Sequence, residues 1–489
     1  MINLKINDRA VEAPQGETIL NVCKSIGIDI PHLCHDPKLK PFSSCFVCVV
    51  EIKGYRNHQP ACSTIAQEGM EIFTDSPGVI KSRKMALELL LSNHYADCVA
   101  PCKLTCPAGV DVQGYISLIE KGLYQEAVAL IKETNPLPAI CGRVCVRPCE
   151  AKCRRQLASD ATPVGIDYLK RFVSDFDLVS KSPYTPKVKP ANGKKVAIIG
   201  GGPAGLTTAY YLQIAGFQAD IYEQKEGAGG WLRYGIPEYR LPNAILDQEI
   251  ANITKLGVKI FTQQQLGNNL QYADLEKNYD AIFLGIGAWD GDLLGIGEAP
   301  APNLVSGIDF LKKNAETGND LDLRGKKVVV VGGGNTAMDC CRSARRCGST
   351  DVVVLYRRTE ADMPANPIEI HESKVEGVEY IFLAAPKAVY YNDKGELTGL
   401  QCIRMKAEKL PGSRRSNIVP IEGSEFDLPC DLVLPATGQK IQYNVLEHIN
   451  EYYAPQSLQL NKWKTLDADT TTFQMNIPKI FAAGDAVTG

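Results

Sequence analysis

The stretch that decides the fold runs from Val196 to Gly205 and reads VAIIGGGPAG. Its four apolar residues predict a buried β-strand, and the glycines that follow predict a tight turn into a helix. Glycines at 200, 202 and 205 have the G-x-G-x-x-G spacing. This spacing is typical of the first strand, turn and helix of a doubly wound α/β domain.

Such a turn lets the backbone approach a pyrophosphate, whose negative charge is favoured at the helix N-terminus. Glu223 ends the next predicted strand, residues 219–223, where a carboxylate can hold ribose hydroxyls. The alternative is a plain glycine turn without a ligand. We predict a dinucleotide site formed by Gly200, Gly202, Pro203, Ala204, Gly205 and Glu223.

The same device recurs at residues 328–339, which read VVVVGGGNTAMD. Its second strand, residues 352–358, ends in Arg357 and Arg358 rather than in an acid. Guanidinium groups can clasp the 2'-phosphate of NADP, which an acid would repel. A solvated strand end is the alternative, and NAD(H) stays possible. We predict an NADP(H) site that includes Gly332, Gly334, Asn335, Thr336, Ala337, Arg357 and Arg358.

These two turns, with the patterns on either side, predict a multidomain chain. Short alternating strands at 2–6, 48–52 and 70–73 with a helix near 18–26 predict a small α+β unit, and helical spacing begins at 77 and continues through stretches such as 112–134. A proline- and lysine-rich linker at 181–193 separates these units from the α/β part. The expected domains are 1–76 (α+β), 77–180 (helical), 194–318 with 430–489 (first Rossmann-type domain) and 319–429 (second Rossmann-type domain, inserted in the first).

Composition excludes several classes. The chain has 489 residues and a formal net charge of -3, which offers no overall positive field for nucleic acid. The N-terminus lacks a signal-peptide pattern, and no apolar run approaches the roughly 18 residues of a membrane span. We expect a soluble, cytoplasmic protein without membrane insertion.

Cysteine is unusually frequent. Of the 17 cysteines, 11 lie in tight groups between residues 34 and 153, and the other six are scattered. A reducing compartment disfavours a disulfide framework, so metal or cluster ligation is indicated.

The first group is Cys34, Cys45, Cys48 and Cys62. Four thiolates suit a 2Fe-2S cluster, and a four-cysteine zinc site is the alternative. Residues 1–93 resemble the N-terminal 2Fe-2S domain of iron-only hydrogenases and of the large Fe-S subunit of complex I, which implies a β-grasp ferredoxin-like fold.

The second group consists of cysteines at three-residue gaps in two distant runs: Cys98, Cys102, Cys106, Cys141, Cys145, Cys149 and Cys153. Neighbouring sulfurs at this spacing lie about one helical turn apart, which suits 4Fe-4S clusters. Seven cysteines are one short of filling two clusters. His94 could supply the eighth ligand, or it could be an ordinary surface residue.

The segments NPLP at 135–138, CGRVC at 141–145 and PCEAKC at 148–153 resemble the cluster domain of the glutamate synthase small subunit and of dihydropyrimidine dehydrogenase. The resemblance runs from about Cys98 to the end of the chain. It implies one 4Fe-4S cluster on Cys98, Cys102 and Cys153, and another on Cys106, Cys145 and Cys149, each with a fourth ligand. The family's cysteine upstream of Cys98 is absent here, which is why His94 is considered as the fourth ligand of the first cluster. The family's Gln or Glu ligand of the other cluster is replaced by Lys170, so Cys141, the remaining cysteine of the group, is the expected fourth ligand there.

Three later stretches also match the glutamate synthase small subunit or related flavoproteins. They are residues 229–242 with Gly230, Leu232 and Arg240, residues 436–439 with Gly438, and residues 482–485 with Gly484 and Asp485. The resemblance implies that they lie near an FAD and the nicotinamide path, so the first dinucleotide is expected to be FAD. In the family the chain normally continues beyond the position of Gly489, so we expect a truncated sequence.

Nicotinamides exchange electrons in pairs and clusters singly, and a flavin can do both. The resemblance therefore implies an NAD(P)H-dependent FAD iron-sulfur oxidoreductase, the electron-transfer subunit of a larger complex of the bifurcating, hydrogenase or formate dehydrogenase type. It would carry FAD, NADP(H), one 2Fe-2S and two 4Fe-4S clusters and pass electrons to or from partner redox subunits. No catalytic acid, base or nucleophile set is apparent. The alternatives are a self-sufficient NADPH oxidoreductase for a small acceptor and a zinc-stabilised binding protein without redox function.

Overall fold

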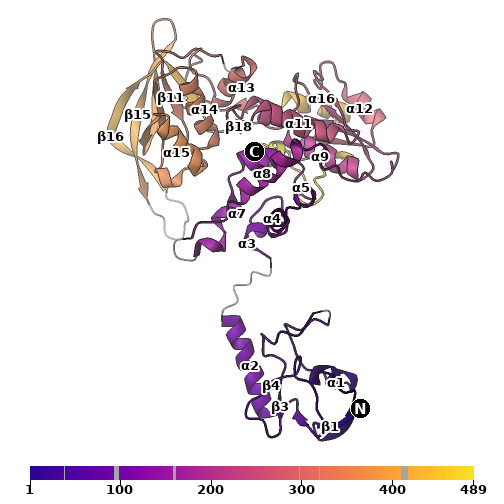
Figure 1. The fold of residues 1–489 in the computed structure, drawn as a ribbon. Helices are drawn as coiled ribbons and strands as arrows, with labels where there is room; N and C mark the ends of the chain where they lie inside the picture. Colours follow the sequence, from indigo (N-terminus) through magenta and orange to yellow (C-terminus); the bar gives the residue numbers. More distant parts are fainter. Residues whose placement is uncertain (38, 93–98, 158–160, 297, 319, 409–416) are drawn as a thin grey trace. The chain divides into compact units, whose positions relative to one another are not determined.

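The computed structural model describes residues 1–37, 39–92, 99–157, 161–296, 298–318, 320–408 and 417–489 (Figure 1). The chain divides into two compact units, Met1–Ala100 and Pro101–Gly489, and each is described by itself. Within the described residues, no helix combines the length and the apolar composition needed to cross a membrane.

The first unit is built on a five-stranded mixed sheet in the order β2-β1-β5-β3-β4. The strands are β1 (Ile2–Ile6), β2 (Arg9–Ala13), β3 (Val49–Ile52), β4 (Gln59–Pro60) and β5 (Glu71–Phe73). β1 alternates buried and exposed residues and pairs parallel with β5. Helix α1 (Ile19–Ser25) begins after Thr18, whose hydroxyl accepts the Asn21 N–H at 3.3 Å, and its apolar face joins the core of the sheet. This agrees with the predicted small α+β unit.

Helix α2 (Pro77–Ser92) belongs to this first unit. Arg83 on α2 donates two hydrogen bonds to the carbonyl of Val49 in β3, at 3.0 and 2.8 Å, and Val79 is fully buried. The sequence predicted a boundary after residue 76, whereas in the structure α2 packs on the sheet that precedes it.

The second unit begins with a helical segment. Its helices are α3 (Pro101–Leu104), α4 (Val112–Glu120), α5 (Tyr124–Lys132), α6 (Pro138–Val144), α7 (Pro148–Ala151), η1 (Arg154–Leu157) and α8 (Ile166–Leu178). The helical stretch predicted over 112–134 is two helices, because Gly122 takes a φ of 72° and ends the first of them. Tyr115, Val128, Ile131 and Val173 form part of the core between these helices.

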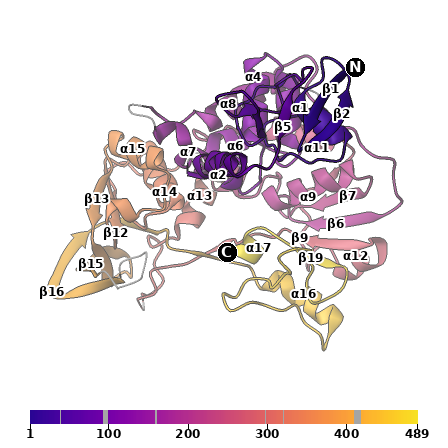
Figure 2. The same cartoon turned by 90° about the horizontal axis from the view of Figure 1, so that it is seen from below.

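A five-stranded parallel sheet follows, in the order β19-β9-β6-β7-β8. The strands are β6 (Lys195–Ile199), β7 (Gln218–Tyr222), β8 (Lys259–Phe261), β9 (Ala281–Leu284) and β19 (Ile480–Ala482). β6 is almost entirely apolar because the sheet is covered on both faces. Helix α9 (Pro203–Ile214) follows the glycine turn after β6 (Figure 2). The helices associated with this part are α10 (Trp231–Tyr234), α11 (Asn243–Thr254), α12 (Tyr272–Asn278), α16 (Asn444–Tyr453) and α17 (Asp485–Thr488).

The chain leaves the first parallel sheet after β9 and forms a second one before it returns at β19. The second sheet has the order β13-β12-β11-β17, all parallel. Its elements are β11 (Lys327–Val331), α14 (Asn335–Arg346), β12 (Asp351–Tyr356), η2 (Glu360–Asp362), α15 (Pro367–Val375), β13 (Glu379–Phe382) and β17 (Leu432–Pro435). An antiparallel ribbon lies between β13 and β17 in the sequence, with strands β14 (Ala384–Tyr391), β15 (Leu397–Glu408) and β16 (Asn417–Pro429).

Two of the predicted boundaries around this second sheet differ from the structure. β17 pairs with β11, so residues 432–435 lie in the second sheet although 430–489 was predicted for the first domain. Helix α13 (Gly307–Glu316) contributes Phe310 and Leu311 to the core of the second sheet, although the second Rossmann-type domain was predicted to start at residue 319. The chain passes between the two parallel sheets twice, first between β9 and α13 and again after β17. In these two segments, β10 (Asp290–Gly291) and β18 (Gln439–Lys440) pair as short antiparallel strands.

The helical segment is not an isolated domain. Leu137, which directly precedes α6, and Ile140 of α6 share one hydrophobic core with residues of β6 and α9, namely Val196, Ile198 and Leu206. Packing therefore joins a cysteine-bearing helix directly to the sheet that carries the first glycine turn.

Candidate functional site

The first glycine turn has the backbone geometry that a dinucleotide site requires. Gly200 has a φ of 102°, and a Cβ there would lie 2.3 Å from the Gly285 carbonyl oxygen. A Cβ at Gly205 would lie 2.0 Å from the Gly200 carbonyl oxygen, so this glycine allows α9 to pack closely on the turn. At Gly202 the nearest atom to a Cβ is 3.8 Å away, which leaves that face of the turn open to a ligand.

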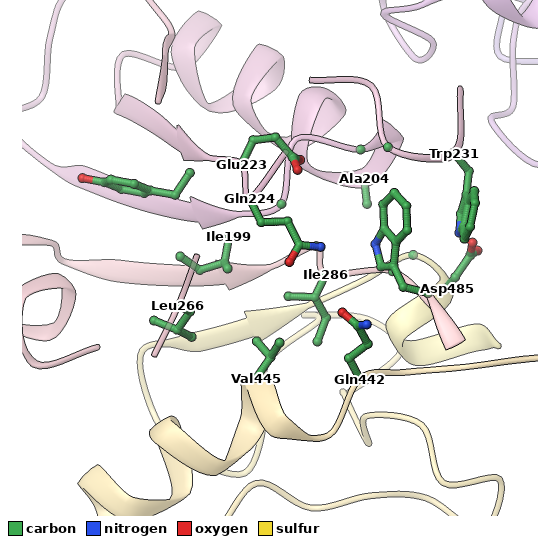
Figure 3. Close-up of a pocket in the computed structure, with 18 of the residues that line it drawn as sticks. Ile199, Ala204, Glu223, Gln224, Trp231, Leu266, Ile286, Gln442, Val445 and Asp485 are labelled. Atoms are coloured by element: carbon green, nitrogen blue, oxygen red, sulfur yellow. The ribbon is translucent and has the colours of Figure 1, made fainter. Parts of the chain in front are cut away.

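A cavity opens at the carboxyl ends of these strands, and we call it the first cavity (Figure 3). Trp231 and Asp485 lie at one end of it, and Ile199 and Leu266 lie toward the other (Figure 3). Of the residues predicted to bind the first dinucleotide, its wall contains Gly200, Gly202, Pro203, Ala204, Glu223, Gly230, Gly484 and Asp485. The structure thus brings together residues from positions 200 to 485 of the chain.

Glu223 is 3% exposed. One carboxylate oxygen accepts the backbone N–H of Gly201 at 2.8 Å and the other accepts that of Lys225 at 2.8 Å. Burial raises the pKa of Glu223, and these hydrogen bonds oppose the shift. The carboxylate is therefore held rigidly beside the glycine turn, where a ribose would lie.

Three residues predicted for this part do not line the first cavity. Gly205 and Leu232 pack behind it. Arg240 is 7% exposed at its side chain, and its Nη1 donates to both carboxylate oxygens of Asp339 at 2.6 and 2.8 Å, while its Nε lies 3.1 Å from Glu369. Its guanidinium thus joins the loop after α10 to α14 and α15, which belong to the second sheet.

The first cavity also contains residues that the sequence did not single out. They are polar or aromatic and come from separate loops: Gln224, Trp231, Gln264, Gln265, Trp289 and Gln442. Trp231 and Trp289 stack with ring centroids 4.3 Å apart, and Trp231 Nε1 donates to the Ala288 carbonyl at 2.8 Å. One signal could have indicated Trp289, since the run 285–289 reads GIGAW directly after a buried strand, where ligands of parallel sheets bind.

A second cavity lies at the other glycine turn. Gly332 has a φ of 149°, and a Cβ there would lie 2.5 Å from the Ala436 carbonyl oxygen, whereas a Cβ at Gly334 would meet nothing within 4 Å. The wall of this cavity contains the predicted residues Gly332, Gly334, Arg357 and Arg358, together with Tyr356, Ala436 and Thr437. Both arginines follow the end of β12, as the sequence predicts.

The remaining predicted residues of this site lie close to it. Asn335, Thr336 and Ala337 form the first turn of α14, and Asn335 Oδ1 accepts the Asn366 N–H at 2.9 Å. Gly438 is next to Thr437 of the wall, and its carbonyl accepts the Asp292 N–H at 3.1 Å. These residues neighbour the wall of the cavity but are not part of it.

The members of the first cysteine group interact with one another in the first unit. Cys45, Cys48 and Cys62 are 7%, 1% and 1% exposed, and Cys34 is less buried. Burial and the neighbouring thiols Cys62 and Cys45 raise the pKa of Cys48 to about 12. Burial raises the pKa of Cys34, but hydrogen bonds with Cys45 and Ser44 outweigh this effect and lower the pKa to about 7. The four sulfurs thus belong to one interacting set.

In the second cysteine group, His94 and Cys98 lie outside the described residues. Thr105 donates to the Pro148 carbonyl at 3.4 Å, which brings the run containing Cys102 and Cys106 beside Cys149. Burial chiefly raises the pKa of Cys102, and Cys153 lies near enough to add to the shift.

Around Cys141 and Cys145 the surroundings are strongly charged. The backbone N–H of Arg147 donates to Cys145 Sγ at 3.3 Å, as in sulfurs that ligate clusters. Burial raises the pKa of the Cys141 thiol, and the Lys170 ammonium opposes this. Lys170 itself lies 2.7 Å from a carboxylate oxygen of Asp167.

In the described part of the chain, no three His, Cys, Asp or Glu side chains converge as ligands of a single metal ion. The ligand sets of the clusters therefore stay predictions that rest on spacing, proximity and resemblance.

Comparison with known proteins assigns all three parts of the chain. A 2Fe-2S iron-sulfur cluster binding domain matches residues 1–77, and dihydropyrimidine dehydrogenase domain II, 4Fe-4S cluster, matches 92–182. A pyridine nucleotide-disulphide oxidoreductase model matches 194–489. The solved structure of FprA from Mycobacterium tuberculosis in complex with NADPH has a TM-score of 0.50 at 19% identity, over 62% of this chain and 80% of that one, and shows a shared fold.

Curated relatives include subunits of larger enzymes. NADP(+)-dependent formate dehydrogenase subunit beta of Moorella thermoacetica is 40% identical, over 80% of this chain and 57% of that protein. NADPH-Fe(3+) oxidoreductase subunit beta of Geobacter sulfurreducens is 41% identical, over 70% of this chain and 51% of that protein. The chain thus spans about half the length of these two relatives. Glutamate synthase (NADPH) small chain of Escherichia coli is 34% identical, over 79% of this chain and 84% of that protein.

Fold, cavities and matches together define the class of protein, an oxidoreductase in which iron-sulfur domains precede a pyridine-nucleotide module. The predicted resemblance to the glutamate synthase small subunit and to the cluster domain of dihydropyrimidine dehydrogenase is confirmed. The pyridine nucleotide-disulphide oxidoreductase model covers more than half of the chain, so the chain belongs to that family.

Proposed function

We propose that this chain is an electron-transfer flavoprotein subunit that links NADP(H), FAD and iron-sulfur clusters to a partner redox subunit. The observation that carries the proposal is the presence of two open glycine turns, each at the carboxyl end of a parallel sheet, in one chain with two cysteine groups. The relatives named as subunit beta or small chain support the role within a complex.

The first cavity is proposed to hold FAD. Gly200 and Gly202 admit the pyrophosphate, α9 places its N-terminus toward it, and Glu223 holds the ribose. Asp485 at the opposite end takes the ribityl chain. FAD supplies, when bound, a group that exchanges electrons in pairs with a nicotinamide and singly with a cluster.

The second cavity is proposed to hold NADP(H). Gly332 and Gly334 shape its turn, and Arg357 and Arg358 bind the 2'-phosphate by charge-assisted hydrogen bonds. The family resemblance adds Arg240 and Gly438 to the residues near the flavin and the nicotinamide.

One 2Fe-2S and two 4Fe-4S clusters complete the proposal. The first unit holds the 2Fe-2S cluster on Cys34, Cys45, Cys48 and Cys62. Cys98, Cys102 and Cys153 with His94 ligate one 4Fe-4S cluster. Cys106, Cys145 and Cys149 with Cys141 ligate the other, since Lys170 pairs with Asp167 and lysine is no cluster ligand.

Chemical analysis of anaerobically purified protein tests this function. We expect stoichiometric flavin and equal amounts of iron and acid-labile sulfide. Zinc without sulfide, or protein without flavin, would refute the proposal and favour a zinc-stabilised binding protein.

A further inference from the structure

A buried ion pair joins the helical cysteine-rich segment to the first parallel sheet and its helices. Lys132, the last residue of α5, donates to Glu249 of α11 at 3.2 Å, and the two side chains are 4% and 1% exposed. Burying two charges brings little net stability, because desolvation offsets their attraction. A pair at this depth is better explained by the geometry that it fixes.

The second carboxylate oxygen of Glu249 reaches a different element. It accepts the backbone N–H of Ala139 at 2.9 Å, in the first turn of α6. Free N–H groups of a first helical turn need acceptors, and a carboxylate there is favoured by the helix dipole. Cys141 lies two residues further along the same helix.

Lys132 also contacts α9, the helix that follows the first glycine turn. Its backbone carbonyl accepts a hydrogen bond from the Tyr211 hydroxyl of α9 at 3.2 Å. α9 begins at the glycine turn that shapes the first cavity. The Glu249 side chain therefore joins α6 and the end of α5 to α11. The backbone at the end of α5 is in turn hydrogen-bonded to α9.

We propose that Lys132 and Glu249 are positioning residues that fix α6, and with it the cluster near Cys141 and Cys145, at a set distance from the flavin. This inference rests on the proposed function. Electron tunnelling slows steeply as donor and acceptor move apart, so a small shift of α6 slows transfer between flavin and cluster. The same shift leaves the NADP(H) and FAD sites unchanged, because neither cavity is lined by Lys132 or Glu249.

The test uses the full-length holoprotein and the variant Glu249→Ala, mixed anaerobically with NADPH. Flavin bleaching and the appearance of reduced-cluster signals in rapid-freeze EPR are followed separately. We expect flavin bleaching at the wild-type rate and cluster reduction slowed by about tenfold or more, as small misplacements of reacting groups can cost about a hundredfold. Hydrogen exchange should be faster at the Ala139 amide.

The conservative pair Lys132→Met with Glu249→Gln keeps an acceptor for Ala139 without an unpaired charge and should restore the wild-type rate. Glu425→Ala, which removes the exposed pair with Lys387, should change neither rate. If Glu249→Ala does not fold, Lys132→Met carries the same expectation. Unchanged cluster reduction in a folded variant would overturn this inference alone, whereas wild-type clusters that NADPH never reduces would overturn the proposed function as well.

Discussion

We propose that the two arginines after β12 determine the preference for NADP(H) over NAD(H). Replacing Arg357 and Arg358 together by glutamine removes charge-assisted hydrogen bonds worth about 1.5–3 kcal/mol, so the KM for NADPH should rise roughly 10- to 100-fold. Steady-state reduction of an artificial acceptor by NADPH and by NADH measures this. The KM for NADH should stay the same.

Arg324 provides the matched control, because it lies in the same part of the chain and its side chain is 81% exposed in a surface pair with Asp322. Arg324→Gln should affect neither coenzyme. Equal losses with NADPH and NADH in the arginine pair variant would show that these residues do not read the 2'-phosphate.

Cys141 is the proposed fourth ligand of the second 4Fe-4S cluster. In Cys141→Ser the weaker hydroxyl ligand should remove or convert one 4Fe-4S signal, with less iron and sulfide per chain, while the 2Fe-2S signal persists. EPR of the reduced protein with iron analysis checks this. Cys347→Ser is the control, since this buried thiol lies far along the chain from the cysteine groups and donates to Asn314 at 3.3 Å, where a hydroxyl can replace it. An unaltered cluster content in Cys141→Ser would exclude Cys141 as a ligand.

At this scale the sequence could predict residues whose role follows from local backbone geometry. The glycines at 200 and 332, Glu223 and the arginines after β12 all occur where motif spacing places them. Trp289 and Gln442 could not be predicted, because they reach the first cavity from loops whose meeting depends on the fold.

The two glycine turns are matched elements that can be broken one at a time. Gly332→Ala places a Cβ 2.5 Å from the Ala436 carbonyl oxygen at a φ of 149°. Gly200→Ala places a Cβ 2.3 Å from the Gly285 carbonyl oxygen at a φ of 102°. Backbone strain of this kind costs about 1–3 kcal/mol. Gly332→Ala should weaken NADPH binding and keep FAD, whereas Gly200→Ala should lose FAD. Flavin content and NADPH titration measure the two effects, and each variant is the control for the other.

Loss of both ligands from either variant would contradict the assignment of one cofactor to each turn.

The loop after α10 is tied to α14 by the buried pair of Arg240 and Asp339. Arg240→Met leaves Asp339 without this partner, so the free energy of unfolding, measured by denaturant titration, should fall by about 3–5 kcal/mol. Adding Asp339→Asn should recover part of this loss. Arg324→Met breaks an exposed pair that solvent screens, so the midpoint of unfolding should stay close to that of the wild type. Equal losses for Arg240→Met and Arg324→Met would show that the buried pair does not hold these elements together.

Element prediction succeeded where periodicity and turn residues agree, as in β1, β6 and β11. It failed where packing decides. The helical pattern of α2 does not show that it packs on β3, and nothing local in α6 shows that Leu137 and Ile140 enter the core of the first parallel sheet. The pairing of β17 with β11 likewise joins segments far apart in the sequence, so local sequence patterns do not predict it.

Over the whole molecule, the iron-sulfur segments precede a module that returns to its first sheet only at β19. The chain spans about half the length of its formate dehydrogenase and NADPH-Fe(3+) oxidoreductase relatives.

Anaerobic reductive titration with NADPH, followed by absorbance and EPR on one sample, measures whether electrons from the nicotinamide reach the flavin and the clusters. We expect the flavin to bleach and reduced 2Fe-2S and 4Fe-4S signals to appear as NADPH is consumed. A flavin that bleaches while every cluster stays oxidised, or a sample that NADPH leaves unchanged, would contradict the proposed electron transfer.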